Sequence, residues 1–316
     1  MTITRNVSPF DGATKWLGSR PLGPEDLRQH VVLVNFWTYT CINWIRTAPY
    51  LRAWAGDYAP DGLLIVGVHT PEFPFERDVE RVEQAAGDRG INYPIAIDND
   101  YAIWNAFDNH YWPALYLLDR DGKDRGHHFG EGNYAWTEQL IQKLLGVEER
   151  DPVDLQGAGD EAAADWAHLR SPETYLGHGR SSGFASYTGV ASGTARVYSS
   201  PEPLLLNQWA LDGSWSIGVE RATLSDADGR LSYRFHARDV HLVMSTETHD
   251  SIAFRVQLEG ASPGRSGGVD VDQNGFGWLE QSRMYQLVRT RGPVRDRTIE
   301  ITFADPGAEV YAFTFG

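Results

Sequence analysis

Apolar runs typical of buried β-strands alternate with helix-compatible segments between residues 31 and 145. The longest runs are residues 31–36 and 63–68, and nearly continuous apolar runs are expected of strands that are covered on both faces. Shorter runs lie at 93–97, 114–118 and 126–129, and helix-compatible segments lie at 45–54, 75–89, 99–107 and 136–145. This alternation, which ends in a hairpin and a helix, predicts an α/β domain with a mixed sheet and helices on both faces.

The pattern changes in the second half of the chain, where short runs of alternating apolar and polar positions replace the helical periodicity. Seven or eight such strands over ~140 residues predict an all-β domain, either a β-sandwich or a jelly roll. An acidic stretch rich in small residues, proline and glycine separates the two patterns. We therefore predict a first domain at 1–147, a linker at 148–172 and a β-sandwich domain at 173–316.

Composition narrows the classes of partner. The net charge of −15 disfavours nucleic acid and anionic membrane surfaces, and no apolar window approaches the ~20 residues of a transmembrane helix. The N-terminus lacks the apolar core of a signal peptide. We therefore expect the cytoplasm for the chain as given. An extracytoplasmic location would fit if the chain were a piece of a longer secreted or membrane-anchored protein.

Cys41 is the only cysteine, so any disulfide must join it to another molecule. It lies between a buried strand and a helix, and the order of elements around it is that of a thioredoxin domain. Unpaired N–H groups and the macrodipole at a helix N-terminus favour a thiolate. A lone cysteine that merely packs in the core is the alternative. The placement between strand and helix favours a reactive thiol at Cys41.

Several motifs resemble the thioredoxin-like domains of TlpA/ResA-type proteins. They resemble more closely the C-terminal region of DipZ-type proteins, which fuse a CcdA-like membrane domain to a thioredoxin-like domain. The matching stretches are FWTYTCIN at 36–43, GVHTPEF at 67–73, DNDYAIWNAF at 98–107, YWPA at 111–114, HHFGEG at 127–132, SPETY at 171–175 and NQWAL at 207–211. The resemblance implies a thioredoxin domain followed by a jelly roll similar to carbohydrate-binding modules.

The chain departs from this family at the second position of the CxxC motif, where Trp44 replaces the resolving cysteine. In the dithiol mechanism the second cysteine releases the product from the mixed disulfide. An external thiol must take that step here. Trp44 lies one helical turn beyond Cys41, where it either fills the vacated space or takes part in catalysis. The resemblance also implies a cis bond before Pro113, with Trp112 and Trp37 as substrate-binding residues.

Three further residues are candidates for roles near the thiol. Thr38 precedes Cys41 by three residues, the spacing at which peroxiredoxins place a hydroxyl beside the peroxidatic sulfur, although Val34 stands where their proline is usual. Arg46 would stabilise a thiolate or be an ordinary solvated helix residue. By resemblance to TlpA-like proteins, Glu72 would be a proton-transfer carboxylate or a plain loop residue.

No metal or cofactor is expected. The stretch DVDQNG at 270–275 resembles the start of a calcium loop, but Gln281 stands where a bidentate Glu belongs, so a β-turn is favoured. Trp209, Trp215 and Trp278 could form a sugar-stacking platform, although most large aromatic residues in a sandwich belong to the core.

Three functions follow from these observations. The first is a monothiol oxidoreductase. Cys41 attacks a disulfide, sulfenic acid or peroxide, and an external thiol, either small or carried by a protein, then resolves the product formed on Cys41. The second is a thiol peroxidase that uses Thr38 and Cys41. The third is a binding module with reduced catalysis, whose β-sandwich binds a glycan or a protein.

Overall fold

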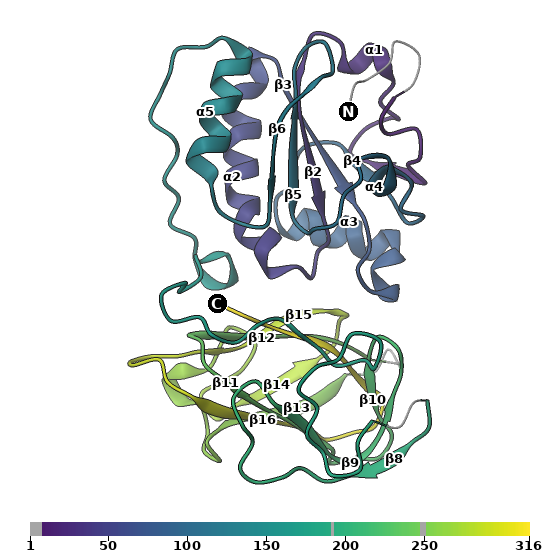
Figure 1. The fold of residues 1–316 in the computed structure, drawn as a ribbon, viewed down its shortest axis with the longest axis vertical. Helices are drawn as coiled ribbons and strands as arrows, with labels where there is room; N and C mark the ends of the chain where they lie inside the picture. The colour runs from purple at the N-terminus through teal and green to yellow at the C-terminus, as the bar shows by residue number, and fades with distance from the viewer. Residues whose placement is uncertain (1–7, 191–192, 247–250) are drawn as a thin grey trace. The chain divides into compact units, whose positions relative to one another are not determined.

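The computed structural model describes residues 8–190, 193–246 and 251–316 and divides the chain into two compact units (Figure 1). The first unit ends at Glu161 and the second begins at Ala162. This boundary falls inside the segment that we predicted to be a linker. Each unit has its own sheet.

The first unit is built on a six-stranded sheet with the strand order β1-β4-β3-β2-β5-β6. Strands β2, β3 and β4 are parallel, and the other three pair antiparallel to their neighbours. The strands are β1 (Lys15–Leu17), β2 (Val31–Trp37), β3 (Leu63–His69), β4 (Ile95–Ile97), β5 (Ala114–Leu118) and β6 (Asp124–Phe129). The mixed sheet and the order of elements confirm the predicted thioredoxin-like α/β fold.

Five α-helices and three short 3₁₀ segments connect these strands in the described part of this unit. The α-helices are α1 (Pro24–Leu27), α2 (Ile42–Tyr58), α3 (Val79–Asp88), α4 (Ala102–Ala106) and α5 (Tyr134–Leu145), and the 3₁₀ segments are η1 (Ala59–Asp61), η2 (Pro74–Arg77) and η3 (Gly159–Glu161). Helices α2 and α3 both follow right-handed crossovers in the same direction, which places them on one face of the sheet.

Alternate residues of the central strands serve the two faces of the sheet. Val32, Val34 and Phe36 pack into an apolar cluster with Ile103 and Trp104 of α4. Successive side chains of a strand point to opposite faces of the sheet, so Asn35 and Trp37 point to the other face, where α2 lies. The segment at 38–41 therefore joins a fully buried strand to a helix with a buried inner face.

Helices α2 and α5 lie side by side, and Glu138 joins them (Figure 1). The Glu138 carboxylate accepts hydrogen bonds from the Trp54 indole at 3.0 Å and from the Tyr58 hydroxyl at 2.7 Å. It also accepts from the N–H of Val153 at 2.9 Å. A buried carboxylate with three donors is well satisfied, so this contact fixes α5 and the chain that follows it.

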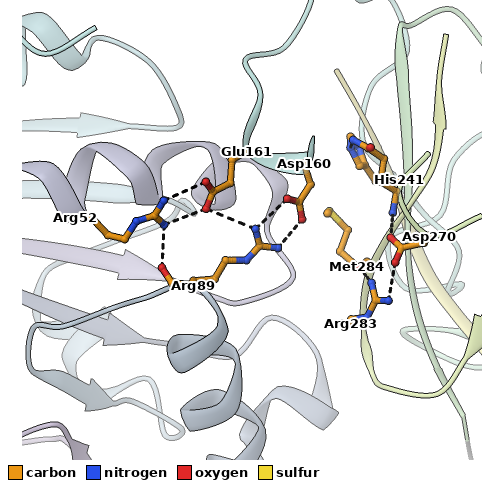
Figure 2. Close-up of polar contacts among 9 residues, drawn as sticks. Arg52, Arg89, Asp160, Glu161, His241, Asp270, Arg283 and Met284 are labelled. Atoms are coloured by element: carbon orange, nitrogen blue, oxygen red, sulfur yellow. Dashed lines mark hydrogen bonds and ion pairs between the residues drawn. The ribbon is translucent and has the colours of Figure 1, made fainter. Parts of the chain in front are cut away.

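The acidic stretch before Ala162 is tied to the first unit by two arginines (Figure 2). Arg52 of α2 binds Glu161 through two hydrogen bonds of 3.0 and 3.1 Å. Arg89, at the end of α3, binds both carboxylate oxygens of Asp160 at 3.0 and 2.5 Å. Arg52 also donates to the carbonyl of Arg89 at 2.9 Å, which links the two arginines into one network.

The second unit is a curled antiparallel sheet of eleven strands, with the main order β14-β13-β16-β11-β9-β10-β17-β12-β15. The strands are β7 (Thr174–Tyr175), β8 (Arg196–Tyr198), β9 (Trp209–Ile217), β10 (Ala222–Leu224), β11 (Arg230–Phe235), β12 (Asp239–Thr246), β13 (Ile252–Leu258), β14 (Phe276–Leu279), β15 (Arg283–Arg289), β16 (Arg297–Phe303) and β17 (Ala308–Phe315). One 3₁₀ turn, η4, spans Gly264–Ser266.

The curled sheet forms two layers, and strand β9 belongs to both of them. Its first half pairs with β11 and its second half with β10, and Gly213 between them has a φ of +92° that suits a corner. Apolar residues from both layers meet in one core, among them Leu231 and Val310. The expected strand-rich second domain is confirmed. Its layers belong to one continuous sheet, and its likeness to carbohydrate-binding modules stays a prediction.

Two expectations about the second unit can be compared with the structure. Trp209 and Trp215 are fully buried core residues, whereas 60% of Trp278 is exposed. Asp272 caps a turn by accepting from the N–H groups of Asn274 and Phe276 at 2.8 Å each. Among the residues that the structure describes, no group of His, Cys, Asp and Glu is arranged to hold a metal, and no helix is long and apolar enough to cross a membrane.

Candidate active site

Cys41 is the N-cap residue of α2, the longest helix in the described chain. Its backbone is extended, with φ −75° and ψ 111°, and its carbonyl accepts the first intrahelical hydrogen bond from Ile45 at 2.9 Å. The Cys41 N–H closes a turn onto the carbonyl of Thr38 at 3.3 Å. The residue is partly exposed. The helix dipole and the unpaired N–H groups of the first turn therefore act on a thiol that a partner can reach.

The sheet brings several predicted residues to the edge where Cys41 lies. Strands β2, β3 and β4 end together, because Trp37 pairs with His69 and His69 pairs with Ile97. Antiparallel β5 begins at this edge, because Ala114 pairs with Phe36. Pro113 is therefore next to Trp37 in register. The Trp112–Pro113 peptide bond is cis, as the family resemblance implied.

Trp112 is partly exposed and held in place at this edge. Its indole N–H donates to the carbonyl of Thr70 at 3.0 Å, and its ring lies 4.3 Å from that of Trp104. On the other side of the cis bond, the carbonyl of Pro113 accepts a hydrogen bond from the N–H of Gly130 at 2.8 Å. The backbone around Trp112 and Pro113 is thus fixed from both sides.

Trp44 and Trp37 form a buried stack on the α2 face of the sheet. Their rings are 4.2 Å apart at an interplanar angle of 26°, and neither residue has exposed surface. Trp44 therefore fills space in the core. Trp37, which we expected to contact substrate, supports the site from within. Gly67 makes room for the Trp37 ring, because a Cβ there would lie only 3.0 Å from its indole nitrogen.

His69 extends this aromatic cluster. Its ring meets Trp37 edge-on at 4.9 Å and stacks on Tyr39 at 5.9 Å. Complete burial lowers the pKa of His69 to about 3, because the imidazolium would be far from water. The imidazole is therefore neutral at physiological pH, and the cluster beneath Cys41 carries no positive charge from this residue.

A buried carboxylate that the sequence reasoning missed, Glu76, lies against the Cys41 turn. Its Oε1 accepts a hydrogen bond from the hydroxyl of Thr40 at 2.6 Å, and Thr40 immediately precedes Cys41. Its Oε2 accepts from the N–H groups of Glu72 at 2.5 Å and Phe73 at 2.9 Å. Burial raises the pKa of Glu76 to about 7, although the hydroxyls of Thr38 and Thr40 oppose this shift. A group with this pKa can gain or lose a proton near neutral pH.

The partners of Glu76 change the interpretation of Thr38 and Glu72. Thr38 is fully buried, and its hydroxyl has no hydrogen-bond partner among the described residues, whereas Thr40 bonds directly to Glu76. Glu72 is partly exposed and takes part through its backbone N–H, while its carboxylate contributes to the raised pKa of Glu76. The signal in the sequence was the pattern Phe73-Pro74-Phe75-Glu76, with a proline at the first helical position and an acid at the third.

Arg46 pairs with Glu131 in the interior, and is not a solvated helix residue. Its Nη1 lies 3.0 Å from Glu131 Oε1, with side-chain exposures of 2% and 6%. Burial raises the pKa of Glu131, and the charge of Arg46 and its hydrogen bond oppose this rise. Because Glu131 follows the Gly130 that bonds to Pro113, this ion pair connects α2 to the segment behind the cis bond.

Comparisons with known proteins agree with this geometry. Residues 17–125 match the AhpC/TSA family, and residues 171–316 match a family described as a thioredoxin-like C-terminal domain. The proteins named DipZ from Mycobacterium tuberculosis and Mycobacterium bovis are each 38% identical over 238 residues, which is 74% of this chain. The chain covers only 34% of the length of these two proteins.

Shorter proteins match less than half of the chain. The thiol-disulfide oxidoreductase YkuV of Bacillus subtilis is 26% identical over 149 residues, which is 47% of this chain and all of YkuV. A solution structure of an oxidised thioredoxin-like protein is 28% identical and covers 46% of this chain and 98% of its own, with a TM-score of 0.41. Residues 17–125 are thus similar to proteins of the AhpC/TSA family, and residues 171–316 are similar to thioredoxin-like C-terminal domains.

Proposed function

We propose that this protein is a thioredoxin-fold thiol–disulfide oxidoreductase that uses Cys41 as its single nucleophile. The observation that carries the proposal is the position of Cys41, partly exposed at the N-terminus of α2 and at the same sheet edge as the cis bond before Pro113. The naming of YkuV as a thiol-disulfide oxidoreductase supports the same reaction class.

The proposed reaction has two exchange steps. The Cys41 thiolate attacks one sulfur of a substrate disulfide, the S–S bond breaks, and the leaving sulfur departs as a thiolate that takes a proton. An external thiolate then attacks the substrate sulfur of the mixed disulfide and displaces the Cys41 thiolate. The external thiol ends in a disulfide with the bound half of the substrate. Trp44 offers no sulfur for this second step, so the partner thiol is obligatory.

The residues around Cys41 have distinct proposed roles. Trp112 and Pro113 present a fixed extended backbone for the substrate. Thr40 connects the Cys41 turn to Glu76, which we propose accepts or supplies the proton of the thiol through local rearrangement, and Thr38 packs inside the turn. Arg46 positions the segment behind Pro113 through Glu131. Trp37 and Trp44 act from the core as support for the turn.

The test is turnover of a small mixed disulfide with glutathione as the external thiol. We expect the wild-type chain to turn over, Cys41→Ser to be inactive, and omission of glutathione to stop the reaction after one equivalent. Trp44→Cys should turn over through a dithiol mechanism, with less dependence on glutathione than the wild type. Equal rates for wild type and Cys41→Ser would contradict the proposal.

Peroxide provides the comparison with a thiol peroxidase. Because Thr38 is fully buried, we favour disulfide substrates over a peroxide bound at its hydroxyl. Sulfenate formation at Cys41 with low-micromolar peroxide, faster than its exchange with disulfides, would favour the peroxidase. No reaction with either reagent would favour a binding module with reduced catalysis.

A glycan is a second candidate ligand, and exposed aromatic residues of the second unit favour it. Trp278 and Phe276 lie two positions apart on edge strand β14 and are 60% and 52% exposed. The guanidinium of Arg255 lies 5.3 Å from the Phe276 ring. Aromatic faces of this kind can stack on sugar rings. A fluorescence titration with soluble polysaccharides should respond in the wild type and in Trp166→Ala, and should fail in Trp278→Ala.

The cytoplasm is the compartment that we propose for the chain as given. A single thiol that depends on an external reductant suits a compartment in which glutathione and related thiols are kept reduced. Detection of the protein by immunoblot in the soluble fraction of lysed cells, and its absence from the extracytoplasmic fraction, would agree. The opposite distribution would place it outside.

A further inference from the structure

The second unit contains a polar cavity that the proposed redox chemistry does not use. Its volume is about 560 Å³, within the range of small-molecule sites. Its floor comes from strands β11 and β16, which lie side by side (Figure 1). Ser232 pairs with Glu300 and Arg234 with Thr298, so these four residues share the outer face of the sheet. The segment at 200–204 and the turn at Glu259 and Gly260 provide the remaining lining.

Ser232 is the residue that makes this cavity a candidate site. It is only 3% exposed although it lies on the outer face of the sheet, and Leu204 beside it in the cavity lining is 6% exposed. Its hydroxyl has no hydrogen-bond partner among the described residues. A buried hydroxyl without a partner costs about 1–3 kcal/mol, so a bound group that completes its hydrogen bonds would be favoured.

The charges of the lining define the class of ligand. Glu202, Glu259 and Glu300 contribute three carboxylates, and Arg234 contributes the one guanidinium among the described lining residues. Glu300 is also held by Arg230 at 3.1 Å, whose guanidinium is shared with Asp212 at 3.1 Å. Glu259 accepts a 2.5 Å hydrogen bond from the N–H of Thr298, which fixes its carboxylate at the rim. The potential in the cavity therefore favours a cation.

We infer that this cavity binds a small ligand with an ammonium group. The ammonium would lie between the carboxylates of Glu202 and Glu259, and one of its N–H groups would donate to the hydroxyl of Ser232. Free diamines and lysine side chains of peptides share this chemistry.

The experiment is isothermal titration calorimetry of the full chain with 1,4-diaminobutane and with an acetylated lysine amide. Glucose and glutarate serve as neutral and anionic probes. We expect the amines to bind and the other two probes to fail. Binding should weaken when the ionic strength rises from about 0.01 M to about 0.15 M. A preference for the lysine amide would identify a peptide as the source of the ammonium, whereas a preference for the diamine would identify a free polyamine, and either preference supports the site.

Matched variants locate the binding. Glu202→Gln and Glu259→Gln should each weaken amine binding. We expect a loss of about tenfold for Glu259→Gln, because the N–H of Thr298 fixes the Glu259 carboxylate. Ser232→Ala should weaken it by a smaller factor, and thermal melting will show whether this variant is folded. Glu280→Gln removes an exposed carboxylate that does not line the cavity and should leave the affinity unchanged. Binding that is absent, that glucose or glutarate matches, or that survives the Glu202→Gln and Glu259→Gln changes together would overturn the inference.

Discussion

At the scale of a single residue, the raised pKa of Glu76 makes the free energy of unfolding depend on pH. Its pKa of about 7 lies above the usual carboxyl value of 4.5 because burial penalises the charged form. Between these two values the folded state holds a proton that the unfolded state has lost. The free energy of unfolding must therefore fall as the pH rises through this window and level off above it. The expected loss is at most about 3 kcal/mol, at ~1.4 kcal/mol per pKa unit.

Glu76→Gln should remove this pH dependence. The amide fits the same contacts, because its oxygen can accept from the N–H groups of Glu72 and Phe73 while its NH₂ group donates to the Thr40 hydroxyl. Urea denaturation at pH 5, 6, 7 and 8 should show the stability of the variant gaining on the wild type as the pH rises. Parallel curves would contradict the raised pKa. Burial also raises the pKa of Asp98. Its contribution is present in both proteins, so it cancels in the difference in stability between Glu76→Gln and the wild type.

The same substitution tests the connection between Glu76 and the thiol. The Glu76 carboxylate is hydrogen-bonded to Thr40, the residue before Cys41, so its negative charge disfavours the Cys41 thiolate. In Glu76→Gln the rate of alkylation of Cys41 by iodoacetamide should therefore rise at a lower pH than in the wild type. Thr40→Val, which removes the hydroxyl that joins the two residues, is the companion variant. An unchanged alkylation profile in Glu76→Gln would limit Glu76 to a structural role.

At the scale of secondary structure, Gly67 of β3 supports the site because it leaves room for the Trp37 ring. In Gly67→Ala the new Cβ would lie 3.0 Å from the Trp37 indole nitrogen and 3.2 Å from the Tyr93 ring, both of which are buried. We expect a loss of about 1–3 kcal/mol and a changed near-ultraviolet circular dichroism spectrum as the Trp37 and Trp44 stack shifts. Gly56→Ala on the exposed side of α2 meets no atom within 4 Å and should be neutral or stabilising.

The ion pair between Arg46 and Glu131 joins two elements, α2 and the segment before α5. Arg46→Met leaves a buried carboxylate without its cation and should cost about 3 kcal/mol or more. The double change to Met at Arg46 and Glu131 should cost less than Arg46→Met alone, because no isolated charge remains. Urea denaturation of the four proteins measures the coupling. Simple additivity of the two single changes would show that the pair is not coupled.

At the scale of the whole molecule, local pattern was enough to predict the two domains and their classes. Continuous apolar runs at 31–36 and 63–68 became the central parallel strands, and the period-two runs became the second sheet. The role of Glu76 could not be predicted, because its raised pKa depends on burial by residues distant in the sequence. Trp37 was expected to bind substrate but is completely buried, because the strand period predicts the face on which a residue lies and not how deeply that face is covered.

The extent of the first unit gives a prediction at this scale. Residues 148–161 are held by buried and part-buried groups. The Arg150 N–H donates to Gln142, the Val153 N–H donates to Glu138, and Arg52 and Arg89 bind the final acids. A fragment that ends at Glu161 should therefore be more stable to urea than one that ends at Val147, by about 2 kcal/mol or more. Cutting at Val147 takes a donor from the buried carboxylate of Glu138, which still accepts from Trp54 and Tyr58.

In the full chain, changing Asp160 to Asn and Glu161 to Gln together should cost less stability than the truncation, because these part-buried ion pairs are only one portion of the contact. Equal stability of the two fragments would show that the folded unit ends before the acidic segment.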